Sequence, residues 1–407
     1  MLSQKTIEIV KSTAPVLEVK GQEITTAFYK LLFSNHPELL NIFNHANQSQ
    51  GRQQTALANT VYAAAKYIDQ LEVLVPAVKQ IAHKHRSLAI KPEHYPIVGK
   101  YLLEAIKEVL GEAATDEIIN AWAEAYGEIA NVFISVERAM YTEAQEQEGG
   151  WIDFKEFVVA DKKEESSVIT SFYLKPKDGG KVASFTPGQY ITIQVSIPGE
   201  KYIMNRQYSL SDAPGKDYYR ISVKREAECN PKGKVSNFLH DGVNVGDTIK
   251  VSAPAGDFVL ESNPHAPITL IAGGVGVTPM ISMLKTLADQ KAENTITFIQ
   301  AARNNQMHAF LDEVNEACDK LDNATAYFGY DADSSAGHFQ GYIEKSFLRQ
   351  AVPSSDSICY VCGPARFMES IIRQLKEIGI QEDRIRYEFF GPAMTLNTEP
   401  VETEAKN

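Results

Sequence analysis

The chain has 407 residues, of which 44% are hydrophobic and 23% charged, and its net charge at pH 7 is −12. A chain of this length exceeds one ordinary hydrophobic core, so we expect a soluble globular protein of two or three domains. The acidic balance, with no basic run to offset it, argues against nucleic acid as a partner, and no apolar run is long enough to predict an integral membrane segment.

The first third of the chain follows a helical period, and strand-like alternation begins abruptly at Trp151. Between the two lies the polar stretch 141–150, which ends in two glycines, as is typical of a helix exit followed by a linker. We therefore predict an all-α domain over residues 1–138 and a linker over 139–150.

Three polar side chains interrupt apolar helix faces in this region. His85 lies in the stripe that contains Val78 and Ile81, and Tyr95 and Glu137 break two other stripes. A buried carboxylate is costly unless it is hydrogen-bonded, so Glu137 and Tyr95 as partners of His85 would satisfy all three. An imidazole held at one nitrogen is an oriented metal ligand. On spacing alone, a core histidine with Glu137 turned to solvent is equally consistent.

The N-terminal helices offer groups for the opposite side of such a metal. Tyr29 lies in an apolar segment that ends at Phe33, Phe43 follows in a loop-like stretch, and Gln53 begins a new apolar stripe. Tyr29 and Gln53 could donate hydrogen bonds to a ligand on a metal held by His85.

Residues 151–262 contain short alternating segments separated by Gly and Pro turns, which predict an antiparallel β-barrel domain. One strand-like segment, Arg206-Gln207-Tyr208-Ser209, displays a cation, an aromatic ring and a hydroxyl, the groups that a flavin ring and its diphosphate need. For four residues alone, an ordinary strand with a solvated Arg is the commoner outcome. Tyr190 lies in a neighbouring strand-like segment, and Lys234 to Asn237 are predicted to open a helix whose amides face the diphosphate.

Residues 266–393 alternate apolar strand-like runs with helical ones, the pattern of a doubly wound parallel α/β domain. A loop joins the first strand of this domain to its first helix, where backbone amides can approach a pyrophosphate. Its members are Gly273, Gly274, Val275, Gly276, Val277, Thr278 and Pro279. The spacing is not G-x-G-x-x-G, and a glycine loop alone is weak evidence. Cys359 and Cys362 would point to opposite faces of a strand, so we reject a metal or redox pair.

The last predicted strand of this domain ends in an acid and aromatic residues. The segment reads Glu388, Phe389, Phe390, Gly391 and Pro392. The polar, acidic tail at 394–407 is expected to be disordered.

Taken in order, these motifs resemble the ferredoxin-NADP reductase superfamily over the second half of the chain. The helical part looks like a globin, and the two together resemble a flavohaemoglobin from end to end. The resemblance implies haem b, FAD and NAD(P)H as cofactors. The chain departs from the family in extra residues around 227–232, which puts only that loop in doubt.

The resemblance also implies residue roles. In the globin part they are Tyr29 and Gln53 on the distal side, Phe43 stacked on the haem, His85 as iron ligand with the Tyr95/Glu137 pair behind it, and Lys84 near the haem edge and flavin. Tyr190 and Arg206 to Ser209 would line the flavin. The loop from Gly274 to Pro279 would bind the dinucleotide, residues 389–392 would close over the flavin, and Glu388 would lie between flavin and haem.

The activity that the resemblance implies is that of a nitric oxide dioxygenase. NAD(P)H would reduce FAD, FAD would reduce the haem iron by single electrons, and the ferrous, oxygen-bound haem would oxidise NO to nitrate, with O2, NO and NAD(P)H as the small-molecule partners. An NAD(P)H-dependent peroxide or ferric reductase, an O2- or NO-sensing globin, and a flavin reductase with a helical docking domain stay open. Four cysteines and an N-terminus without an apolar signal core predict a cytoplasmic protein, which we expect to be a monomer.

Overall fold

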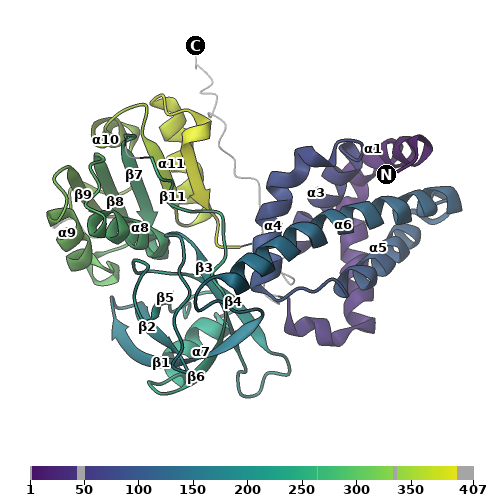
Figure 1. The fold of residues 1–407 in the computed structure, drawn as a ribbon. Helices are drawn as coiled ribbons and strands as arrows, with labels where there is room; N and C mark the ends of the chain where they lie inside the picture. The colour runs from purple at the N-terminus through teal and green to yellow at the C-terminus, as the bar shows by residue number, and fades with distance from the viewer. Residues whose placement is uncertain (1, 44–50, 264, 333–336, 392–407) are drawn as a thin grey trace, which may run out of the picture.

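The computed structural model describes residues 2–43, 51–263, 265–332 and 337–391. A helical part, an antiparallel sheet and a parallel sheet follow one another along the chain (Figure 1). The predicted fold class is confirmed by this order. No helix in these ranges combines the length and apolarity that a membrane crossing requires.

The helical part has a globin-like arrangement of long helices. Its elements are α1 (Gln4–Asn35), η1 (Pro37–Asn41), α3 (Arg52–Lys66), η2 (Leu71–Leu74), α4 (Val75–Ser87), α5 (His94–Leu110), η3 (Gly111–Ala113) and α6 (Asp116–Glu146). Ser3 and Thr115 cap α1 and α6 by accepting hydrogen bonds from backbone amides of the first turn. Phe28, Leu102 and Trp122 from three helices share one core, which holds the long helices together.

The segment after α6 is shorter than the predicted linker. Helix α6 continues to Glu146, so residues 139–146 are helical and only Gln147 to Gly150 connect it to Trp151. The stretch from Tyr141 to Glu146 has no Gly or Pro to stop a helix, which explains the extension.

The middle part is a six-stranded antiparallel sheet with one helix. It comprises β1 (Phe154–Glu164), β2 (Ile169–Pro176), β3 (Tyr190–Val195), β4 (Met204–Ser209), β5 (Tyr219–Lys224), α7 (Lys234–Gly242) and β6 (Thr248–Ser252), in the order β4-β3-β6-β1-β2-β5. The edge strands β4 and β5 approach each other beyond the end of β4 through the single bridge Leu210↔Ile221. The sheet is therefore strongly curved but is not the closed barrel that the alternating pattern predicts, because β4 and β5 form no continuous ladder.

The last part is a six-stranded parallel sheet, with strand order β10-β9-β8-β7-β11-β12. Its elements are β7 (Ile268–Gly273), η4 (Gly274–Gly276), α8 (Val277–Asp289), β8 (Ile296–Ala302), η5 (Asn305–Met307), α9 (Leu311–Asp319), β9 (Ala324–Tyr330), β10 (Phe339–Gln340), α10 (Lys345–Ala351), β11 (Ile358–Cys362), α11 (Ala365–Glu377), η6 (Glu382–Arg384) and β12 (Ile385–Glu388). Helices α8 and α9 cover one face and α10 and α11 the other. Cys359 and Cys362 belong to the cores on opposite faces, as expected of residues three apart on a strand.

A buried ionic network joins the two sheets. Arg220 of β5 is 2% exposed and donates two hydrogen bonds, of 2.7 and 2.9 Å, to the carboxylate of Glu313 at the start of α9. Lys285 of α8 bridges Glu313 and Asp212, at 3.0 and 2.6 Å. Burial raises the pKa of Glu313, but Arg220 and Lys285 outweigh it and hold that pKa below its ordinary value.

Replacing Arg220 with Ala removes the buried guanidinium from the network. The buried carboxylate of Asp212 and the partly buried one of Glu313 then have only Lys285 and the more exposed Lys163, which lies 3.6 Å from Glu313, as cations. We expect the free energy of unfolding of the two-sheet part to fall by about 3–5 kcal/mol, the usual cost of breaking a buried pair. Urea titration followed by circular dichroism measures it. Lys175→Ala, which removes a solvent-exposed pair with Asp217, is the control and should change little.

Candidate functional site

Helix α4 carries an imidazole that is held rigidly at one nitrogen. His85 Nδ1 lies 2.7 Å from Glu137 Oε1 and 3.2 Å from Tyr95 Oη, and Tyr95 donates a 2.5 Å hydrogen bond to the same Glu137 oxygen. Glu137 is 2% exposed. Because a carboxylate oxygen can only accept, Nδ1 carries the proton and Nε2 keeps its lone pair. No hydrogen bond to Nε2 exists within the described residues, so this nitrogen is available for a metal.

Burial, followed by the charge of Glu137, raises the pKa of Tyr95 far above its ordinary value. The phenol therefore stays protonated and remains a donor to Glu137. The alternative in which Glu137 turns to solvent is wrong, because helix α6 places this residue on its buried face beside Phe133. Three residues from α4, α5 and α6 thus form one buried hydrogen-bonded group.

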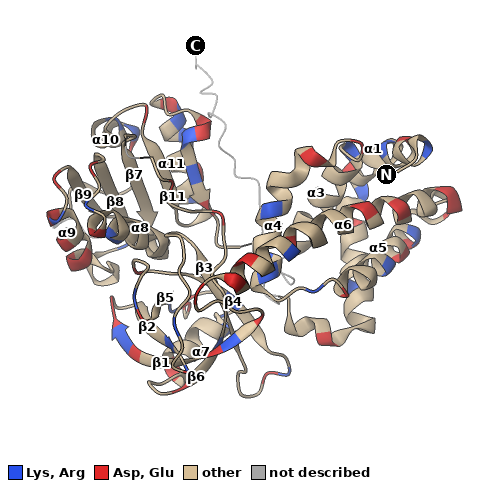
Figure 2. Ribbon diagram, in the orientation of Figure 1, with Lys and Arg blue, Asp and Glu red and all other residues tan. Residues whose placement is uncertain are grey.

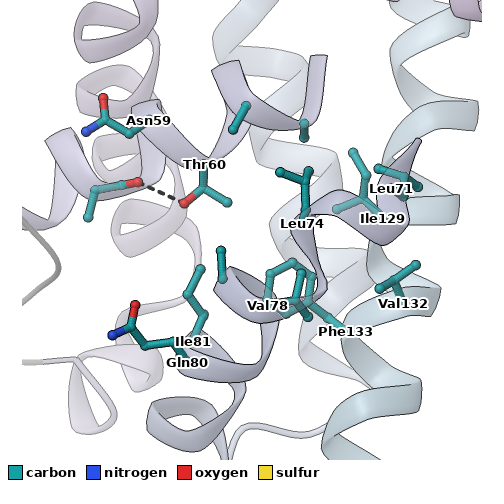
Figure 3. A pocket seen from close by; sticks show the side chains of 14 residues that line it. Asn59, Thr60, Leu71, Leu74, Val78, Gln80, Ile81, Ile129, Val132 and Phe133 are labelled. Atoms are coloured by element: carbon teal, nitrogen blue, oxygen red, sulfur yellow. Dashed lines mark hydrogen bonds between the residues drawn. The ribbon is translucent and has the colours of Figure 1, made fainter. Parts of the chain in front are cut away.

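An apolar cavity of about 290 Å³ lies between α3 and α4 and is also lined by residues of α6. Figure 3 shows Thr60 of α3 on one side of the space and Val78 and Ile81 of α4 on the other, with Phe133 of α6 drawn beside Val78. Phe133 also contacts the His85 ring, with centroids 5.9 Å apart, and Ile81 precedes His85 by one helical turn. An apolar space beside an oriented imidazole fits a haem.

The predicted distal residues lie on the other helices of this part. Tyr29 is buried in α1, its ring stacked on Phe33 at 5.7 Å and edge-on to Phe43 at 5.9 Å. Gln53 lies in the first turn of α3, partly buried. The cavity separates α3 from α4, so Gln53 and His85 lie on the two helices that face each other across it.

The flavin segments come together as neighbouring strands. Tyr190 of β3 pairs with Ser209 of β4, and Ile193 pairs with Arg206, so the predicted residues share one edge of the sheet. Gln207 donates a 3.3 Å hydrogen bond to Thr192, and Tyr208 packs partly against the core. The Tyr190 hydroxyl is buried without a hydrogen-bond partner among the described residues. Such an orphaned donor, next to Arg206 and Ser209 on the same strand pair, fits a bound flavin.

Lys84 and the segment after β12 meet at the boundary of the globin and reductase parts. Lys84 Nζ donates a 2.5 Å hydrogen bond to the Gly391 carbonyl, and burial lowers the pKa of this lysine. Glu388 ends β12, where burial raises its pKa to about 7 although the charge of Lys84 opposes this. Phe389 is half-buried and Phe390 exposed. Pro392 and the tail 394–407 lie outside the described residues.

The glycine loop packs against the segment after β11. A Cβ at Gly276 would lie 2.2 Å from the Cys362 carbonyl oxygen, so only glycine allows this close approach, and Gly274 has φ +54°. Thr278 donates to the Val275 carbonyl at 3.1 Å and helps to shape the turn. Cys362 at the end of β11 pairs with Ala272 of β7 on one side and with Glu388 of β12 on the other. The carboxyl ends of these strands therefore bring together the glycine loop, the segment after Cys362 and Glu388. Dinucleotides bind at this edge of parallel sheets.

Sequence reasoning missed two residues at the boundary between the globin and the reductase. His83 and Arg86 do not belong to the apolar stripe of His85, and they contact the reductase rather than solvent. Gly256 N donates a 3.2 Å hydrogen bond to His83 Nδ1, and the Arg86 guanidinium donates to the Pro254 carbonyl. The basic residues on both sides of His85 could have indicated an interface, but a solvent-exposed helix face shows the same pattern.

The acidic charge of the chain is carried in part by the globin. Figure 2 shows bands of Asp and Glu along α6, while Lys and Arg are scattered over the reductase. The chain therefore has no general positive field that would attract anionic cofactors.

Residues 26–133 match the globin family, residues 156–260 the oxidoreductase FAD-binding domain and residues 270–373 the oxidoreductase NAD-binding domain. A flavohemoprotein of Bacillus cereus (strain ATCC 10987 / NRS 248) is 59% identical and covers 97% of this chain and 100% of that protein. The flavohemoprotein of Bacillus subtilis (strain 168) is 52% identical, with coverage of 97% and 99%. The chain belongs to the flavohemoprotein family.

Solved structures agree with this assignment. A flavohemoglobin from Malassezia yamatoensis, crystallised with bound FAD and heme, superposes with a TM-score of 0.86 at 29% identity and covers 96% of this chain and 100% of that one. The FAD/NAD-binding domain of a nitric oxide dioxygenase from Vibrio cholerae is 41% identical, with a TM-score of 0.56, and covers 59% of this chain and 100% of that one. This flavohemoprotein is therefore an oxidoreductase whose cofactors are haem, FAD and a nicotinamide dinucleotide.

Replacing His85 with Ala tests the iron ligand. We expect the purified variant to lose the Soret band while it retains FAD and the transfer of electrons from NADH to ferricyanide. The reason is that the predicted flavin-binding residues, Tyr190 and Arg206 to Ser209, which we call the flavin seat, lie in another domain. Absorbance spectra of the variant and of Lys79→Ala, an exposed change on the same helix, give the comparison. A normal Soret band in His85→Ala would contradict the assignment.

The raised pKa of Glu388 predicts a pH-dependent stability. An acid whose folded pKa exceeds its unfolded value of 4.5 ionises more readily in the unfolded chain, so its effect lowers stability as pH rises from about 4.5 to about 7 and is constant above. The melting temperature of the wild type relative to Glu388→Gln should therefore fall over this window. Thermal melts of the two cofactor-loaded proteins at matched pH values measure the difference, and two parallel profiles would refute it.

Proposed function

We propose that this flavohemoprotein is a nitric oxide dioxygenase, which uses NAD(P)H and O2 to convert NO to nitrate. The observation that carries the proposal is the buried group of His85, Glu137 and Tyr95 in a chain that also holds a complete flavin reductase. When bound, FAD converts hydride into single electrons, and the haem iron accepts them and binds oxygen.

Glu137 and Tyr95 act on the iron through His85. The carboxylate accepts a hydrogen bond from His85 Nδ1–H at 2.7 Å and gives the ring partial imidazolate character. Tyr95 donates to the same carboxylate and keeps it in place. A strongly donating imidazole favours oxygen activation, whereas a reversible oxygen carrier has little need of it. This arrangement supports an oxidative reaction over simple binding.

Tyr29 and Gln53 are proposed to act on the opposite side. The packing of Tyr29 against Phe33 and Phe43 restricts its ring to one orientation. A phenol held in this way can donate a hydrogen bond to a ligand that gains negative charge, without reorganisation during the reaction. The amide of Gln53 would be a second donor to the same ligand.

Lys84 and Glu388 are proposed to act between flavin and haem. Lys84 immediately precedes His85 in α4. Its hydrogen bond to the Gly391 carbonyl connects the globin part to the segment that follows β12. Tyr190, Arg206 and Ser209 would hold the flavin, and the loop from Gly274 to Pro279 would hold the dinucleotide.

The domain limits inferred from the sequence, 1–138, 151–262 and 266–393, are retained as a proposal, and so are a cytoplasmic location and a monomeric state.

The decisive measurement is the nitrate yield per NAD(P)H consumed, with haem- and FAD-loaded protein under air and pulses of NO. A two-electron donor that feeds a one-electron centre should give about two nitrates per NAD(P)H, with NO removal much faster than background oxidation. Cofactor oxidation that is indifferent to NO and yields no nitrate would leave a peroxide or ferric reductase. NO binding without turnover would leave a sensor.

A further inference from the structure

Helix α4 contacts the reductase through the residues that flank His85 in the chain. His83, Lys84 and Arg86 of this helix all contact the reductase, at Gly256, Gly391 and Pro254 respectively. The helix that supplies the iron ligand is thus also the element that docks on the flavin-binding part.

The segment contacted by His83 and Arg86 is bonded directly to the flavin seat. Tyr190 N donates to the Ala255 carbonyl and Ala255 N donates to the Tyr190 carbonyl, both at 2.8 Å. Gly256 has φ +117°, and a Cβ there would lie 3.0 Å from the Tyr190 ring. Residues 254–256 are therefore held between α4 on one side and Tyr190 on the other.

The interaction of Arg86 is unusual in its electrostatics. Its side chain is 7% exposed, yet it has no carboxylate within 4.0 Å among the described residues, and its one hydrogen bond goes to the Pro254 carbonyl. A buried guanidinium without an ion pair costs stability, and hydrophobic residues would fill the same space at lower cost. The five fixed donors of Arg make it suited to specify the position of a backbone segment rather than to stabilise it.

A second globin contact lies elsewhere on the reductase. Asn205 donates to the carbonyls of Asn41 and Ile42, at 2.9 and 3.1 Å, from β4. This contact involves η1 and the residue after it, not α4, so it can hold the two parts together without fixing the position of His85 relative to Tyr190. That position depends on the contacts of α4 itself. Lys84 contacts Gly391 after β12, and His83 and Arg86 are the α4 residues that contact the segment bonded to Tyr190.

We propose that His83 and Arg86 are positioning residues that lock the helix carrying the haem ligand to the strand carrying the flavin seat, and so set the rate of electron transfer from FAD to haem. The inference rests on the electron path of the proposed function but not on the reaction with NO. Electron transfer weakens steeply with separation, and small displacements of reacting groups have large effects on rate.

The test compares full-length, haem- and FAD-loaded Arg86→Ala, Arg86→Lys and His83→Ala with the wild type, and uses Lys79→Ala as the matched control. Lys79 is a basic residue of the same helix that faces solvent. Proteins are mixed with NADH in an anaerobic stopped-flow instrument under CO. FAD reduction is followed by flavin bleaching, haem reduction by the CO-trapped Soret band, and direct flavin output by ferricyanide reduction.

We expect Arg86→Ala to slow haem reduction by at least about tenfold, with FAD reduction and ferricyanide reduction within about twofold of the wild type. His83→Ala and Arg86→Lys should show smaller losses in the same step only, since each keeps part of the contact, and Lys79→Ala should match the wild type. Hydrogen exchange of residues 253–257 should also rise in Arg86→Ala.

Haem reduction at the wild-type rate in Arg86→Ala would overturn the proposal, and so would an equal loss in all three steps, which indicates general damage. If Arg86→Ala does not fold, Arg86→Lys decides the question by the same criterion. Because NO is absent from the assay, failure of nitric oxide dioxygenase activity leaves this result unaffected.

Discussion

The position of one short helix constrains most of this molecule. Helix α4 places His85 against the buried carboxylate of Glu137 on one face and docks on the reductase through its other residues. A carboxylate in an apolar core is stable only where donors surround it, so α4, α5 and α6 must pack in one arrangement for Glu137 to be satisfied. The orientation of the imidazole and the geometry of the globin are thus fixed by the same hydrogen bonds.

Buried polar groups also constrain the interface between the two sheets of the reductase. Arg220, Lys285, Glu313 and Asp212 are buried charges that satisfy one another only when the antiparallel and parallel sheets are correctly docked. The glycine loop and Glu388 then reach the same sheet edge because parallel strands end together. The proposed path from dinucleotide to flavin to haem would cross two docked interfaces, and buried polar groups lie at each of them.

Much of this was accessible from residue pattern. Periodicity predicted the helical region and the alternation of strands and helices after residue 266, because each element buries one face and the spacing of apolar residues records it. The interruptions at His85, Tyr95 and Glu137 predicted a buried polar group, and the segments at Tyr190 and Arg206 predicted a flavin seat. What pattern could not decide was whether Glu137 faced the core, since residues near a predicted helix end are equally consistent with solvent. The helix extends past it to Glu146 because nothing in the sequence stops it.

The amino-acid sequence by itself determined the order of the three parts, the faces of their helices and strands, and the residue types at each cofactor segment. Only the tertiary structure decided which of these segments meet. Three sets of contacts join residues that lie far apart in the chain. They are the bridge between the ends of β4 and β5, the ionic network of Arg220, and the docking of His83 and Arg86 on the reductase. Local periodicity predicts whether a side chain faces the interior. It does not predict which residue that side chain contacts, because the partner belongs to another element that is brought close only by tertiary packing.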